Sequence, residues 1–182
     1  ERGGADGDGA VAPGFAGPLP GALRKRIGED TVLVEYLLGP NQSYVWVLTD
    51  EGLKMRRIAG ARTLEPMVDR FMETLVEPEL TGAQFERHRK LGERLFVELV
   101  GPIEDVVSDH DRIIVAADQS LYRLPFEALI RPDRKGRVDY LVGDHVISYT
   151  PSTGALDMLV DRQSTANSGQ RALVMGAPNL DR

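Results

Sequence analysis

The stretch IIVAADQSLYRLPFEALI, residues 113–130, joins an uninterrupted apolar run to a proline-containing segment a few residues later. The run at 113–117 is typical of a strand buried on both faces. α/β proteins often keep their chemistry just beyond such strand ends, so an apolar segment there needs an explanation. Pro125 lacks a backbone N–H and suits a strand edge or a loop, while Phe126 and Leu129 are expected in the core. We therefore interpret this stretch as packing rather than as a substrate contact.

Upstream, three short β-branched and aromatic runs predict an antiparallel three-stranded meander. They cover residues 31–38, 43–49 and 53–58, and turn residues separate them. Side chains alternate along a strand, so the middle strand should place one set of residues on each face. The two expected sets are Tyr44, Trp46 and Leu48 on one face, and Val45 and Val47 on the other.

Two amphipathic helices follow the meander. Apolar residues at helical spacing predict the first from Thr63 to about residue 75. The second begins at a capping box formed by Thr81 and Gln84 and stops at Gly101. Its apolar stripe, which needs a packing partner, comprises Leu91, Leu95, Phe96 and Leu99.

The rest of the chain predicts further strands and one more helix. The expected elements are a charged surface turn at 131–137, a strand at 145–149, a helix capped by Ser152 and ending at 160, a loop at 163–170 and a strand at 172–175. The order strand, helix, strand indicates a parallel βαβ unit with a right-handed crossover, in which 113–117 pairs with 172–175.

Composition excludes several classes of protein. The net charge of −6 and the pI of about 5.1 argue against direct nucleic-acid binding. No apolar run is long enough to cross a membrane, so no membrane partner is expected and the cytoplasm is the default location. The 182 residues include no cysteine, which excludes disulfides, thiolate metal sites and a cysteine nucleophile in this chain. The Gly-, Ala- and Pro-rich residues 1–22 are interpreted as a flexible linker, and Glu1 as a sign that something preceded it.

The three histidines and the serines provide no convincing catalytic group. His88 lies inside the second helix and is interpreted as solvated. His110 stands between two aspartates, Asp109 and Asp111, but a further metal ligand is missing. His145 would need a serine presented by a tight turn, and without a G-x-S-x-G motif Ser120 and Ser152 are poor candidates. We therefore predict no catalytic, cofactor-binding or metal-binding residues and no cofactor.

The order of the segments nevertheless resembles a known family. EDTVLVEYLLGPNQSYVWVLTDEGLKMRRI, then DRIIVAADQSLYRLPFEALI, YLVGDHVISYTPSTGALDML and RALVMGAPNLD are similar to the N-terminal half of a CHAT domain, a caspase-like domain usually found after tetratricopeptide repeats in bacterial proteins. The family commonly has Asp-Gly where this chain has Asp118-Gln119. The resemblance implies an α/β, partial caspase-like fold over residues 23–182, with a meander and helices followed by parallel core strands.

The resemblance also implies where the chemistry lies. In the family a His-Gly strand and a later strand ending in Cys form a dyad that cleaves peptide bonds, and none of these positions is matched here. We therefore expect a non-catalytic scaffold part of a CHAT cysteine endopeptidase, inactive alone, which relays a signal from an upstream repeat or sensor domain. Its expected partners are the C-terminal peptidase half, that upstream domain and the protein substrate of the parent. The alternative is a non-enzymatic protein–protein interaction module.

Two expectations concern the end of the chain and its association state. Three explanations of the end at Arg182 are open. The first is that the chain or its ordered part simply ends there. The second is that Arg182 is a processing site, and the third is that the half-domain is a natural non-catalytic regulator. If the missing half supplies neighbouring strands, the strands at 113–117 and 172–175 keep an uncovered apolar edge, so the chain alone should aggregate or dimerise.

Overall fold

The computed structural model of the chain describes residues 23, 27–76, 81–132 and 138–165, the side chains of 161–165 excepted. The strands are β1 (Thr31–Leu37), β2 (Gln42–Leu48), β3 (Leu53–Ala59), β4 (Arg112–Ala116), β5 (Ile130–Arg131), β6 (Asp139–Tyr140) and β7 (Val146–Tyr149). The α-helices are α2 (Ala61–Leu75), α3 (Gly82–Leu99), α4 (Glu104–Val107) and α5 (Thr153–Thr165). Short 3₁₀ turns are η1 (Gly101–Ile103), η2 (Gln119–Arg123), η3 (Phe126–Ala128) and η4 (Leu141–Gly143).

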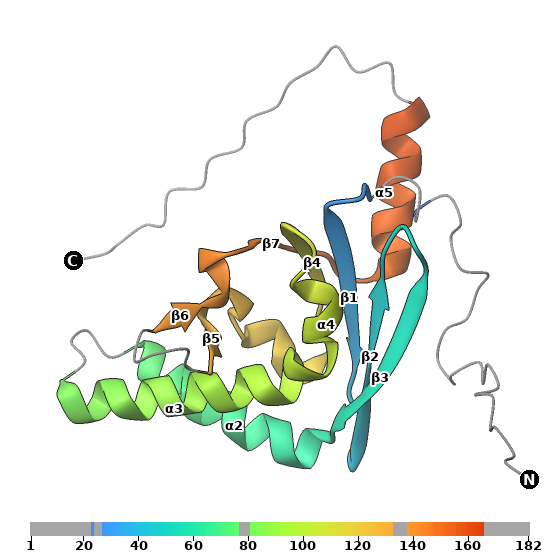
Figure 1. Ribbon diagram of the computed structural model, residues 1–182. Coiled ribbons are helices and arrows are strands. Elements are labelled where there is room, and N and C mark those ends of the chain that lie inside the picture. The colour runs from blue at the N-terminus through green and yellow to red at the C-terminus, as the bar shows by residue number, and fades with distance from the viewer. Residues whose placement is uncertain (1–22, 24–26, 77–80, 133–137, 166–182) are drawn as a thin grey trace, which may run out of the picture.

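A five-stranded sheet in the order β3-β2-β1-β4-β7 is the frame of the molecule. The first three strands form the predicted antiparallel meander, while β4 pairs in parallel with β1 on one side and with β7 on the other. α2, α3 and α4 cover one face of this sheet, and α5 lies on the other (Figure 1). The mixed α/β fold and the division into a meander, helices and parallel strands are as predicted.

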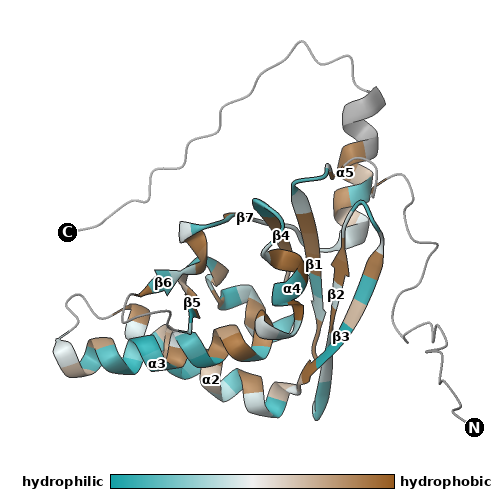
Figure 2. Cartoon of the chain, viewed as in Figure 1, coloured by the Kyte–Doolittle hydropathy of each residue, from teal (hydrophilic) through white to brown (hydrophobic). Residues whose placement is uncertain are grey.

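The core divides between the two faces of the sheet in the way that strand alternation requires. Val45 and Val47 of β2 point into the large core under α2 and α3, whereas Leu48 points into a smaller one with Leu33 and the partly buried Leu156 of α5. The predicted separation of the valines from Leu48 is therefore confirmed. In Figure 2, β1 is hydrophobic over most of its length, whereas β3 carries hydrophilic segments and forms an outer edge of the sheet.

The predicted helices are present, with corrections at two ends. α3 starts at the predicted capping box, in which the Thr81 N–H donates to Gln84 Oε1 at 2.9 Å. α2 begins two residues before Thr63, because the Ala61 N–H finds a partner in the carbonyl of Gly39, at 2.8 Å, and needs no side-chain cap. α5 runs past residue 160 to Thr165, so residues 163–165 are helical rather than a loop; no Gly or Pro stands there to stop the helix before Gly169.

The segment after β4 packs as predicted. Leu124, Phe126 and Leu129 are all buried, and Pro125 precedes η3 in an extended conformation. Phe126 lies beside Tyr36 of β1, with ring centroids 5.4 Å apart. The stretch therefore continues the core from the strand into the turns that follow it.

The predicted pairing between 113–117 and 172–175 is not possible in this arrangement. Both edges of β4 are occupied, by β1 and by β7, so no edge remains for another strand. Residues 172–175 themselves lie outside the described part of the chain. The expectation of an uncovered edge at 113–117 was wrong for the same reason, and the outer parallel strand is β7.

Candidate functional site

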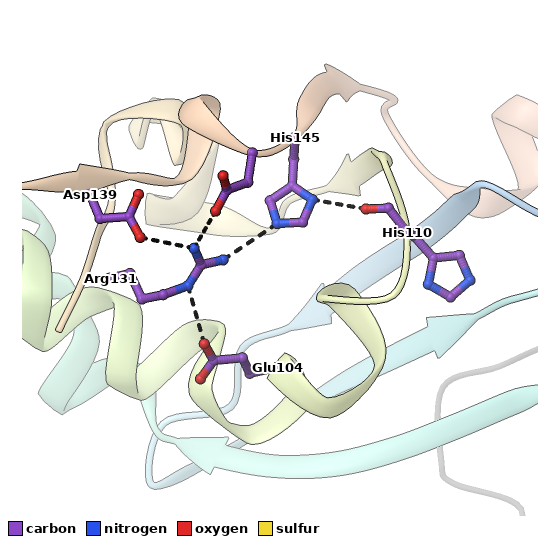
Figure 3. A network of polar contacts seen from close by, with 6 residues as sticks. Glu104, His110, Arg131, Asp139 and His145 are labelled. Atoms are coloured by element: carbon purple, nitrogen blue, oxygen red, sulfur yellow. Dashed lines mark hydrogen bonds and ion pairs between the residues drawn. The ribbon is translucent and has the colours of Figure 1, made fainter. Parts of the chain in front are cut away.

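The densest polar cluster of the described residues surrounds the guanidinium of Arg131, at the end of β5. Its Nε donates to Glu104 Oε1 at 3.2 Å, and its Nη1 donates to Asp139 Oδ2 at 3.1 Å and also to Asp144 Oδ2. Only 13% of the side chain is exposed, and the guanidinium lies 5.6 Å from the centroid of the Phe96 ring. One cation therefore ties together α4, β5, β6 and the end of η4 (Figure 3).

His145 completes the cluster and is held in one tautomer. Its Nδ1 lies 2.8 Å from the carbonyl oxygen of His110, so this nitrogen carries the proton. Its Nε2 is then an acceptor and faces Nη2 of Arg131 at 3.5 Å. The His110 ring points away from the guanidinium (Figure 3), and its own Nδ1 bonds to the carbonyl of Val106 at 2.8 Å. Both imidazoles are therefore fixed by backbone carbonyls.

A polar hollow of about 240 Å³ opens beside this cluster, and its lining is mostly charged: Glu104, Ser108, His110, Asp111, Arg131, Asp144 and His145. Burial works against the charge of the guanidinium, but the carboxylates of Asp144 and Asp139 outweigh it and raise the pKa of Arg131 above its ordinary value. The cation is permanently charged and already has three carboxylate partners. The arrangement can therefore hold four elements in register.

Sequence reasoning missed Arg131, which it placed in a charged surface turn. The side chain instead turns inward from β5; residues 133–137 of that turn lie outside the described part of the chain. Its partners are 8, 13 and 27 residues away along the chain, so no local pattern marks them. The one available signal was an arginine directly after an apolar run, with two aspartates 8 and 13 residues further along the chain.

The interpretation of His88 as solvated was also wrong. Only 3% of this residue is exposed; its ring stacks on Phe71 at 5.0 Å between centroids, and its Nδ1 lies 2.9 Å from the hydroxyl oxygen of Thr74. The Thr74 hydroxyl in turn donates to the Phe71 carbonyl, so His88 Nδ1 is the donor. Burial lowers the pKa of His88 below its ordinary value. This histidine therefore joins α2 to α3.

The end of β4, where α/β folds often bind ligands, is used to hold the neighbouring strand instead. Asp118 Oδ2 accepts the Leu38 N–H at 2.8 Å, and Gln119 Nε2 donates to the Leu38 carbonyl at 3.0 Å. Gln119 has φ +47°, in the left-handed region that favours glycine. This is the position where the CHAT family commonly has Gly. Gln119 therefore holds a strained backbone conformation, while its side chain and that of Asp118 clamp both backbone groups of Leu38.

Ser152 and His145 have structural partners, whereas the Ser120 hydroxyl is buried without a hydrogen-bond partner among the described residues. The Ser152 hydroxyl accepts the Ala155 N–H at 3.1 Å, which confirms it as a helix cap. The hydrogen bonds of His145 go to a carbonyl and to Arg131 rather than to a serine. Within the described residues, no three His, Asp or Glu side chains converge as metal ligands, Asp109, His110 and Asp111 included. Among the same residues, no helix has the length and hydrophobicity that a membrane crossing requires.

The fold and site define a mixed α/β protein whose polar centre is an arginine cluster. Comparison with known families gives a match to the CHAT domain over residues 89–182. The chain belongs to the CHAT domain family, a peptidase-related family, and the resemblance seen in the sequence is confirmed.

Other comparisons add little. No curated protein matches the chain. Among solved structures, the chain is similar to the crystal structure of apo psk41 parM protein, with 12% identity and a TM-score of 0.38. That match covers 80% of this chain and 49% of the other, so the chain spans about half the length of the matched structure.

Proposed function

We propose that this chain is the non-catalytic framework of a CHAT-type cysteine endopeptidase. The observation that carries the proposal is the CHAT match over residues 89–182 in a chain without cysteine. A thiolate is the nucleophile of such peptidases, so the nucleophile must come from another part of the parent protein. The chemistry of the parent is then hydrolysis of a peptide bond by a Cys/His pair outside this chain.

The histidines support this assignment. Each has a ring nitrogen in a hydrogen bond that holds the fold: His88 with Thr74, His110 with the Val106 carbonyl and His145 with the His110 carbonyl. A general base also needs its second ring nitrogen within reach of the thiol. His88 and His145 are buried, with 3% and 6% of the residue exposed, so we assign them to positioning helices and turns, as expected of a framework.

The Arg131 cluster suggests how such a framework relays a signal. It connects α4 to β5, β6 and the turn before β7, so a displacement of α4 is transmitted to the outer parallel strand. We infer that an upstream repeat or sensor domain acts through this connection on the peptidase half. The parent would be a bacterial, cytoplasmic protein in signalling or regulated proteolysis.

The test compares two lengths of protein. The 182-residue chain and a version extended with the coding sequence that continues after Arg182 are incubated with fluorogenic peptides and with casein. We expect turnover only by the extended protein, and none after its added cysteine is replaced by alanine. Turnover by the 182-residue chain, or unchanged turnover after the cysteine replacement, would overturn the proposal.

The relay is tested in the extended protein joined to the domain encoded upstream of Glu1. Arg131→Met should reduce the response to the upstream domain, whereas Arg123→Met, which removes an exposed ion pair with Asp69, should leave it unchanged. If both variants responded equally to the upstream domain, the relay would be excluded, whereas the framework role would be unaffected. A non-enzymatic interaction module remains the second candidate, because the outer strand β7 is open to a partner among the described residues.

A further inference from the structure

The two outer strands of the sheet differ in charge. β3 carries Lys54, Arg56 and Arg57, and charged side chains are a common device against edge-to-edge association. β7 has the sequence VISY and no charge, with Val146 65% exposed and Tyr149 49% exposed. Among the described residues, one edge of the sheet therefore carries charges that oppose strand addition and the other does not.

The backbone of β7 presents hydrogen-bonding groups to the outside. The N–H groups of Val146 and Thr150 donate inward, to the carbonyls of Asp111 and Val115 at 2.8 and 2.9 Å. Successive amides point to opposite sides of a strand, so the N–H and C=O groups of Ile147 and Tyr149 point away from β4. Among the described residues no strand pairs with this side of β7.

We propose that β7 pairs with β7 of a second copy of this chain, antiparallel and around a two-fold axis. The outward groups determine the register, because Ile147 must exchange both hydrogen bonds with Tyr149 of the second copy. The axis then passes through Ser148, whose side chain faces Ser148 of the second copy in the closer, non-hydrogen-bonded type of pair. Val146 faces Thr150, so no like charges meet.

The charges of the two edges favour self-pairing through β7 and disfavour it through β3. An antiparallel pairing of β3 with itself would set lysine and arginine side chains against each other, and like charges directly opposite are destabilising. The β7 pairing opposes only neutral side chains, and exposed Tyr122 and Val142 lie on the turns around it. Tyr122 is near the end of β7, since its hydroxyl contacts the Pro151 carbonyl.

The first test uses charge at the axis. Sedimentation velocity of the 182-residue chain at increasing concentration should show the mass rising toward twice 20.0 kDa. Ser148→Lys and Ser148→Asp each place like charges at the axis and should weaken association by about tenfold or more. An equimolar mixture of the two should associate again, because Lys then faces Asp. Arg57→Glu on β3 is the control and should still self-associate.

The second test uses the absence of cysteine from the chain. In Ser148→Cys the only two thiols of a dimer would face each other across the axis, at a Cα separation that a disulfide accepts. Mild oxidation should convert most of the chain to a covalent dimer, whereas Lys54→Cys on β3 should form little covalent dimer although it still associates through β7. Circular dichroism confirms that each variant is folded.

Three results would overturn the proposal. The first is a monomer at every concentration, and the second is a dimer that both charge variants leave intact. The third is an absence of association in the mixture of lysine and aspartate variants. None of these results bears on the peptidase framework, which is tested by turnover of the extended protein.

Discussion

The meander with α2, residues 31–75, and the segment from η1 to β7, residues 101–149, contribute to the same core by different means. The first region uses strands of seven residues and a helix of fifteen. In its described residues, the second uses strands of two to five residues and four 3₁₀ turns. It is held by the Arg131 cluster and by the clamp of Asp118 and Gln119 on Leu38. The long elements also gain hydrogen bonds within their own region, whereas the short ones depend mainly on contacts distant in sequence.

The largest expected effect tests whether the two regions unfold together. Phe71 and Phe126 lie in one continuous core, so Phe71→Ala and Phe126→Ala should each lower the free energy of unfolding by about 3–5 kcal/mol. Urea unfolding is followed by circular dichroism and by fluorescence of Trp46, the single tryptophan. Both probes should shift together for both variants. If the unfolding transition of Phe126→Ala left the Trp46 fluorescence unchanged, the two regions would be independent units. If the alanine variant does not fold, Phe126→Leu is used in its place.

A smaller effect is expected at the polar cluster of the second region. Arg131→Met should cost about 1–3 kcal/mol of unfolding free energy, because it leaves Glu104 and Asp139 without their partner, although both can reach water. Arg123→Met is the matched control, since the Arg123–Asp69 pair is more than half exposed on both sides and should change stability by less than about 0.5 kcal/mol. Equal losses in the two variants would show that the cluster is no more than a surface network.

The burial of His88 between α2 and α3 should make the stability of the protein depend on pH. Burial lowers its folded-state pKa below the unfolded value of 6.5, so the unfolded state binds a proton first as the pH falls. The contribution of His88 to stability is therefore complete above about pH 6.5 and decreases below it. His88→Asn retains a donor for Thr74 but cannot titrate; its stability deficit relative to wild type should shrink as the pH falls from 7.5 to 5. A constant deficit would argue against a neutral, buried His88.

The smallest effect concerns the clamp at the end of β4. Gln119→Ala loses the bond to the Leu38 carbonyl and keeps the positive φ, so it should cost about 0.5–1.5 kcal/mol. Gln119→Gly loses the same bond but relieves the backbone strain, and its stability should lie within about 0.5 kcal/mol of wild type. Thermal unfolding of the three proteins gives the difference. Glycine and alanine variants of equal stability would exclude strain at this position.

The positions of the elements could largely be predicted, and the side-chain cluster could not. The meander, the α3 capping box and the packing of Phe126 follow from alternation, cap chemistry and hydrophobicity, all of which act over a few residues. Arg131 and His88 were misplaced because a charged or polar residue in a helix or turn is usually solvated. Burial of each depends on partners that only the folded chain brings together.

By itself, the sequence determined the family, the alternation of the strands, the caps of α3 and α5, and the lack of a thiol in this chain. Those properties are local or compositional. Only the tertiary structure decided that β4 is central with both edges paired, that Arg131 joins four elements and that β7 is an uncharged outer strand. Strand order and ion-pair partners depend on contacts between distant segments, where several pairings satisfy the same local pattern and packing selects among them.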